Sequence, residues 1–79
     1  MRVDVLPREE FVLEEDRHLA YADHPLPIGH GQTCSQPRTV ADMLQLLDVR
    51  EGQRVLDVGS GSGWTTALLG HLVGPTGRV

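Results

Sequence analysis

The clearest repeat of apolar residues lies in the middle of the chain. These residues recur at i, i+3, i+4 and i+7, the spacing of one helix face; they are Val40, Met43, Leu44 and Leu47. Upstream, Ser35 is a favourable N-cap, and Pro37 falls in the first turn, where its missing N–H costs nothing. The pattern predicts a helix that runs to about Asp48.

A strand and a second helix are predicted downstream. Residues 54–58 are nearly continuously apolar and rich in β-branched side chains, as expected of a strand covered on both faces. A helix is predicted to begin near Gly63 or Trp64, and it has a mostly apolar face; the residues of this face are Trp64, Ala67, Leu68, His71 and Leu72. Residues 74–77 end this helix, and residues 78–79 resemble the start of another strand.

The remaining segments complete one α/β pattern. Residues 1–24 carry most of the acidic excess and predict short helices without a clean apolar stripe. Prolines and glycines punctuate residues 25–37, which predicts a loop. Residues 38–79 then supply a helix, the first strand, a glycine turn and a helix. The order predicts the opening of a doubly wound α/β fold, and residues 1–79 form a single incomplete domain with an incomplete sheet.

Composition and charge exclude several classes of protein. The net charge is −4, and the seven basic residues are scattered arginines, so nucleic acid is not an expected partner. We find neither a signal-peptide pattern nor an apolar run near the roughly 18 residues that span a bilayer. A single cysteine rules out an internal disulfide and fits a reducing compartment. We expect a cytoplasmic protein that does not bind membranes.

Cysteine and histidine side chains are candidates for nucleophilic catalysis or metal binding. The histidines match no metal-ligand spacing, so we expect solvated or locally hydrogen-bonded rings and no metal site; they are His18, His24, His30 and His71. Cys34 could be a reactive thiol or a small buried apolar side chain. The second reading is favoured because no neighbouring lysine or paired base would hold a thiolate.

The turn after the predicted strand has a glycine at every second position from Gly59 to Gly63. Glycine permits positive φ and lets the backbone approach a ligand closely. The third glycine comes one residue too early for the G-x-G-x-x-G fingerprint, and no P-loop Gly-Lys-Ser/Thr is present, so a pyrophosphate site fits poorly. A glycine turn without a ligand is the alternative.

The spacing D-x-G-x-G-x-G after a buried strand resembles the first motif of Rossmann-like S-adenosylmethionine-dependent methyltransferases. In that family the turn lies against the methionine part of the cofactor. The resemblance therefore implies a set of cofactor-binding residues: Asp57, Gly59, Ser60, Gly61 and Gly63. It leaves the methyl acceptor open.

A second resemblance indicates the acceptor. Residues 25–37 are similar to the L-P-I-G-x-G-Q-T-I-S-Q/A-P segment of protein-L-isoaspartate O-methyltransferases, which repair isoaspartyl peptides. Upstream, P-R-x-x-F-V and R-x-x-A-Y also match that family, so the resemblance covers nearly the whole chain. It implies that Ser35 is catalytic and that Gln32 and Thr33 bind substrate. A plain N-cap role for Ser35 is an alternative that can coexist with catalysis.

The implied reaction is methyl transfer from S-adenosylmethionine to the free carboxylate of L-isoaspartyl residues. An ionised carboxylate and a sulfonium donor need mainly alignment and exclusion of water. A methyltransferase for another carboxylate or peptide, and a noncatalytic interaction module, are the alternatives. Since the strand at residues 54–58 would lack sheet neighbours, we expect a truncated, inactive chain that self-associates through its incomplete sheet.

Overall fold

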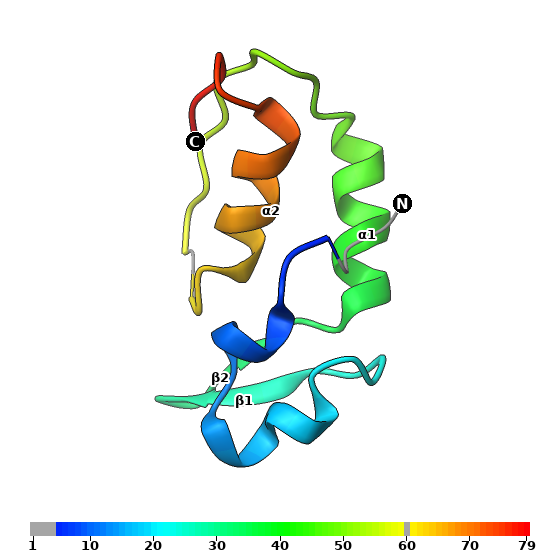
Figure 1. Ribbon diagram of the computed structural model, residues 1–79, viewed down its shortest axis with the longest axis vertical. Helices are drawn as coiled ribbons and strands as arrows, with labels where there is room; N and C mark the ends of the chain where they lie inside the picture. The colour runs from blue at the N-terminus through cyan, green and yellow to red at the C-terminus, as the bar shows by residue number, and fades with distance from the viewer. Residues whose placement is uncertain (1–4, 60) are drawn as a thin grey trace.

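The computed structural model describes residues 5–59 and 61–79. Figure 1 shows the two α-helices running lengthwise in one part of the molecule, while a hairpin and two short 3₁₀ helices form the other end. The elements in chain order are η1 (Arg8–Phe11), η2 (Glu14–Leu19), β1 (Leu26–Gly29), β2 (Gln32–Cys34), α1 (Pro37–Leu47) and α2 (Trp64–Val73). The short helices predicted before residue 25 are confirmed as η1 and η2.

The prediction of a loop over residues 25–37 is wrong, because its centre forms the antiparallel hairpin β1–β2. The register pairs Leu26 with Cys34 and Pro27 with Thr33. Both strands of a two-stranded sheet are edge strands, and an edge strand tolerates the missing N–H of proline. Positive φ occurs at the last residue of β1, Gly29, and at the two turn residues His30 and Gly31.

Helix α1 confirms the helix predicted from apolar spacing. Its N-cap is Gln36 rather than Ser35, and Pro37 occupies the first turn as expected. At the other end Asp48 adopts a left-handed conformation, and its N–H donates to the carbonyl of Leu44. The helix therefore ends where the sequence predicts, and Ser35 does not cap it.

Only half of the predicted apolar face of α1 is buried. Val40 and Leu44 are each 5% exposed, whereas Met43 and Leu47 are 65% and 59% exposed. The buried pair faces the core cluster shared with α2. The spacing thus identified the helix, while the position of α2 selected the buried stripe.

Helix α2 begins at Trp64, as predicted. Trp64 and Leu68 are buried as expected, but His71 is exposed, and Leu69 and Val73 are buried in addition. A helix that is apolar around most of its circumference has no unique buried stripe in its sequence. Packing against α1 and the hairpin decides which side chains of α2 are buried.

The strand predicted for residues 54–58 is wrong within the described chain. This segment forms an isolated parallel bridge between Arg54 and Arg78, in which the N–H of Val55 donates to the carbonyl of Arg78 at 2.8 Å. Leu56 and Val58 are 85% and 83% exposed. A buried parallel strand needs pairing partners on both sides, and residues 78–79 supply only one short neighbour.

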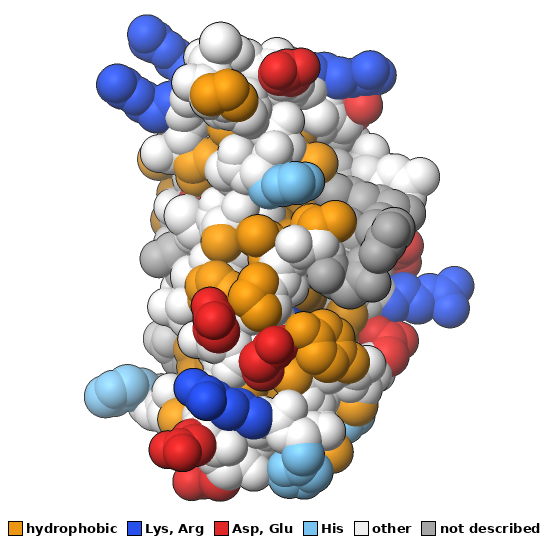
Figure 2. Space-filling view, viewed as in Figure 1, with side chains coloured by type: hydrophobic (Ala, Val, Ile, Leu, Met, Phe, Trp, Pro, Cys, Tyr) orange, Lys and Arg blue, Asp and Glu red, His pale blue; other side chains and the backbone are white. Residues whose placement is uncertain are grey.

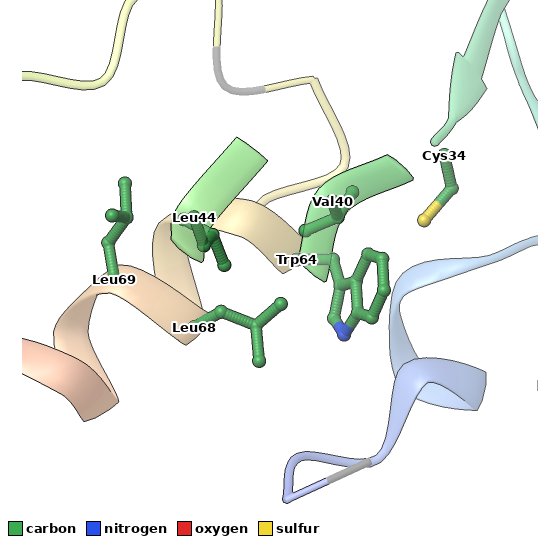
Figure 3. Packing of buried hydrophobic residues seen from close by; sticks show 6 residues of the cluster. All are labelled: Cys34, Val40, Leu44, Trp64, Leu68 and Leu69. Atoms are coloured by element: carbon green, nitrogen blue, oxygen red, sulfur yellow. The ribbon is translucent and has the colours of Figure 1, made fainter. Parts of the chain in front are cut away.

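The core joins α1, α2 and the end of β2. Figure 3 shows Val40 and Leu44 of α1 next to side chains of α2, with the Trp64 ring on the side nearest Cys34. Cys34 is a free thiol, 2% exposed, which confirms the prediction of a small buried apolar side chain. The buried members of the cluster are Cys34, Val40, Leu44, Trp64, Leu68 and Leu69.

Asp23 ties the N-terminal region to the start of α1. Its Oδ1 accepts a hydrogen bond from the Arg38 N–H at 2.8 Å, and its Oδ2 accepts one from Gln36 Nε2 at 3.2 Å. These bonds, led by the one from Arg38, lower the pKa of the Asp23 carboxyl. Asp23 thereby satisfies a backbone donor in the first turn of α1, which the N-cap residue leaves without a side-chain partner.

We expect Leu44→Ala to lower the free energy of unfolding by about 2–5 kcal/mol, because it opens a cavity in the core. Leu46→Ala on the same helix is the matched control, since Leu46 is 87% exposed. Its free energy of unfolding should change by less than about 0.5 kcal/mol. Urea unfolding followed by far-ultraviolet circular dichroism measures both. Equal losses for the two variants would contradict the assignment of the core.

We also expect Asp23 to make the fold sensitive to acid. The pKa of its carboxyl is lower in the folded than in the unfolded chain, so its stabilising contribution is present above the ordinary value of 3.8. That contribution is lost as pH falls through the lower folded pKa. Urea unfolding at about pH 6 and about pH 3 should show a smaller acid-induced loss in Asp23→Asn than in the unchanged chain. Asp42→Asn, at an exposed position of α1, should retain the full loss.

Candidate functional site

A buried arginine lies between the hairpin and α2. Arg8 is 1% exposed, and its guanidinium lies over the Trp64 ring, 5.1 Å from the ring centroid. Its nitrogens donate to four main-chain carbonyls: Nη1 to Ala20 at 2.6 Å, and Nη2 to His24 at 3.2 Å, Cys34 at 3.3 Å and Ser35 at 3.1 Å. One side chain thus holds three separate segments of backbone beside the first residue of α2.

Sequence reasoning missed this role of Arg8. It described the basic residues only as scattered arginines, and a buried arginine is rare unless it is paired. The available signal was the place of Arg8 in the P-R-x-x-F-V stretch. Its four acceptors are backbone carbonyls, which every residue carries, so no pattern of side chains marks them.

The three residues predicted to handle substrate lie on or beside β2. Gln32 and Thr33 are exposed strand residues, and Ser35 is exposed directly after the strand. The Ser35 carbonyl is held by Arg8 at 3.1 Å. The hairpin therefore fixes the backbone of these residues while it leaves their side chains accessible.

The glycine turn has the backbone that its sequence predicts. Gly59, Gly61 and Gly63 have φ of +71°, +56° and +89°, a region that favours glycine. A Cβ built on Gly61 would lie 3.7 Å from Ile28 Cδ1, whereas one on Gly59 or Gly63 would meet nothing within 4 Å. The turn therefore lies close to β1 at its centre and is open at both flanks. Ser60, also predicted to bind cofactor, lies outside the described residues.

A cleft of about 330 Å³ lies between the hairpin, η1 and the glycine turn. It brings Gln32 of the predicted substrate set together with Gly61 of the predicted cofactor set. The other described residues of both sets, including Ser35 and Asp57, do not line it. Its lining residues are Glu10, Phe11, Val12, Leu13, Ile28, Gly29, His30, Gln32, Gly61 and Ser62.

Asp57 anchors the segment that leads into the turn. Its Oδ2 accepts a hydrogen bond from the Thr66 hydroxyl in the first turns of α2. Asp57 borders a second cavity of about 520 Å³, which is lined mainly by apolar residues of α1, α2 and residues 55–56. Figure 2 shows hydrophobic side chains reaching the surface through the middle of the viewed face. In this chain Asp57 thus fixes backbone beside the glycine turn.

The region around η1 carries negative charge. The Tyr21 hydroxyl donates to Glu9 Oε2, and this bond is the main cause of the lowered pKa of the Glu9 carboxyl. Glu10, the next residue, lines the cleft. Glu9 and Glu10 are neighbours in η1, so this end of the cleft lies near two acidic side chains.

Residues 5–59 and 61–79 show neither a metal cluster nor a helix that could span a membrane. No group of three or more His, Cys, Asp and Glu residues there is arranged to hold a metal ion. In the same ranges, no helix is both long enough and apolar enough to cross a bilayer. His24 Nδ1 lies 3.2 Å from the Pro25 carbonyl, a local contact of the kind expected for a histidine outside a metal site.

The chain is similar to known methyltransferases over almost its whole length. The model of the protein-L-isoaspartate(D-aspartate) O-methyltransferase family matches residues 2–79. A protein-L-isoaspartate O-methyltransferase of Methanothrix thermoacetophila is 60% identical over 74 residues, which are 94% of this chain and 35% of that protein. The enzyme of that name from Aeropyrum pernix is 61% identical over 74 residues, 94% of this chain and 28% of that protein. The chain thus spans about a third of the length of these curated relatives.

Proposed function

Because this chain belongs to the protein-L-isoaspartate(D-aspartate) O-methyltransferase family, we propose that it supplies the substrate hairpin and part of the cofactor site for methylation of isoaspartyl carboxylates. One observation carries the proposal. The cleft of about 330 Å³ has Gln32 of the hairpin and Gly61 of the glycine turn on its walls. A methyl acceptor held by β2 would therefore lie next to a donor held by the turn.

S-adenosylmethionine is the proposed cofactor, and it supplies a methyl group activated by the sulfonium. The described glycines fit this role, because positive φ at all three exposes backbone, and the space beside Gly59 and Gly63 is open. Asp57, Gly59, Gly61 and Gly63 would hold the cofactor together with Ser60. The bond from Thr66 to Asp57 keeps the entry to the turn in place.

We also propose that the chain forms part of a Rossmann-like sheet. Supporting it is the parallel bridge between Arg54 and Arg78, with α2 between the two bridged residues. A strand, a crossover helix and a parallel strand form the unit from which such sheets are built. The exposed apolar side chains of Leu56 and Val58 are suited to packing against further elements of that fold.

Alignment is the main task of the chain's own residues. The carboxylate of an isoaspartyl residue is ionised at neutral pH, so it needs no general base to become a nucleophile. The hydroxyls of Ser35 and Thr33 and the amide of Gln32 would hold this carboxylate by donating hydrogen bonds. Apolar walls such as Phe11 and Ile28 would exclude water from the cleft.

Self-association is a second candidate function for the isolated chain. Leu56 and Val58 are exposed apolar residues beyond a short parallel bridge, in which backbone bonds join Gln53 and Val55 to Arg78. The edge of this segment offers pairing to another copy. Sedimentation equilibrium would show a mass that rises with concentration in the unchanged chain and less so in Leu56→Lys. A concentration-independent monomer would contradict this candidate.

The enzymatic proposal predicts activity when the chain is joined to the remaining part of the Methanothrix relative. This fusion should transfer labelled methyl groups from S-adenosylmethionine to a peptide containing L-isoaspartate. The same peptide with ordinary aspartate is the control, and it should react at a negligible rate. Equal rates for the two peptides, or no transfer by a folded fusion that binds the cofactor, would contradict the proposal.

The glycine turn predicts a specific defect in cofactor binding. Gly61→Ala places a Cβ at φ +56° beside Ile28, which strains the turn. In the fusion we expect the KM for S-adenosylmethionine to rise about tenfold, equivalent to about 1.4 kcal/mol. Gly70→Ala is the matched control, because a Cβ there meets nothing within 4 Å and Gly70 lies inside α2. Equal KM values for S-adenosylmethionine in the two variants would contradict the assignment of the turn to the cofactor site.

A further inference from the structure

Arg8 contacts the backbone on both sides of the hairpin and the first residue of α2. Its guanidinium donates to the carbonyls of Ala20 and His24, which precede β1, and to those of Cys34 and Ser35, which end β2. The same guanidinium also lies over the ring of Trp64, the first residue of α2. The base of the hairpin and the end of the glycine turn therefore meet at one cation.

We propose that Arg8 is a positioning residue, which fixes the Ser35 end of the hairpin relative to the glycine turn. This inference rests on the proposed methyltransferase function, since it assigns Arg8 a role in binding the isoaspartyl acceptor. Arg8 does not line the cleft, so the proposed role involves no contact with the acceptor. It acts through the backbone of Cys34 and Ser35.

The choice of acceptors supports a positioning role over simple charge pairing. Every hydrogen bond that the structure shows for Arg8 ends on a main-chain carbonyl. A bond to the Ser35 carbonyl constrains the backbone that carries the proposed catalytic hydroxyl, whereas a bond to a side chain would leave that backbone freer. The planar guanidinium can donate in several in-plane directions while it lies over the Trp64 ring.

Lysine cannot reproduce this geometry. Its ammonium is a compact point charge with three donors, and it lacks a flat face for stacking on the Trp64 ring. Arg8→Lys preserves the positive charge but leaves some of the four carbonyls, of which those of Ala20 and Cys34 are buried, without a donor. The hairpin end should then shift, whereas the glycine turn, which Arg8 contacts only through the neighbouring Trp64, should keep its conformation.

The first experiment measures steady-state kinetics of the fusion carrying Arg8→Lys. We expect the KM for the isoaspartyl peptide to rise about tenfold, the cost of losing one hydrogen bond to a charged group. The KM for S-adenosylmethionine should stay within about twofold of the unchanged fusion. Arg17→Lys, at an exposed position in η2, is the matched control and should leave both constants unchanged.

A loss of folded protein alone would not produce the selective rise in peptide KM that the positioning role predicts. A merely structural role for Arg8 would lower the maximal rate in proportion to the folded fraction and leave both KM values unchanged. Val40→Ala provides this reference, because it removes core volume away from the cleft. If Arg8→Lys behaves like Val40→Ala, the positioning role is overturned. Should Arg8→Lys not fold, Trp64→Phe tests the same contact, with an expected rise of about threefold in peptide KM.

The second experiment uses the 79-residue chain without any enzymatic assay. The chain contains one cysteine and one tryptophan, and both lie beside Arg8. In Arg8→Lys we expect Cys34 to react with a maleimide about tenfold faster and the emission of Trp64 to shift to longer wavelength, because the hairpin end opens more often. Labelling rates and emission equal to those of Arg17→Lys would overturn the inference.

The two experiments separate the two proposals. An unchanged fusion that folds but transfers no methyl group contradicts the proposed function, while Cys34 labelling still tests whether Arg8 holds the hairpin end. An active fusion in which Arg8→Lys leaves the peptide KM unchanged contradicts the positioning role and leaves the proposed function intact.

Discussion

The buried guanidinium of Arg8 is the interaction on which the arrangement of this chain depends. It donates to carbonyls of the segment before β1 and of the end of β2, and it lies over the ring of Trp64, the first residue of α2. A buried charge is costly unless hydrogen bonds compensate it, so the segments must approach together. The helical pair and the hairpin share few other polar contacts in the described chain, and the apolar cluster around Trp64 completes the junction.

This junction explains how a cleft forms between two segments with separate proposed tasks. The hairpin presents Gln32, and the glycine turn presents Gly61, on walls of the same space. The positive φ of the glycines is permitted by the absence of a Cβ, whereas the hairpin is held in place by Arg8 and, through Asp23, by the start of α1. The proposed donor side is thus local in origin, and the proposed acceptor side depends on tertiary contacts.

Sequence reasoning succeeded where the relevant interactions are close along the chain. The spacing of Val40 and Leu44 predicted α1, and the glycine turn predicted where α2 begins. It failed where partners decide the outcome. Pro27 was taken as evidence for a loop, but an edge strand accepts it. Residues 54–58 have strand composition, yet they pair only at one end, because residues 78–79 are their sole parallel neighbour in the described chain.

The sequence by itself therefore determined the two α-helices, the conformation of the glycine turn and the family to which the chain belongs. These features depend on side-chain periodicity, on the absence of a Cβ and on runs of adjacent residues. All three can be read directly from the order of residues in the sequence. The tertiary structure alone decided the buried stripes of both helices, the register of the hairpin and the role of Arg8. Its acceptors are main-chain carbonyls up to 27 residues away, and carbonyls leave no signature in a sequence.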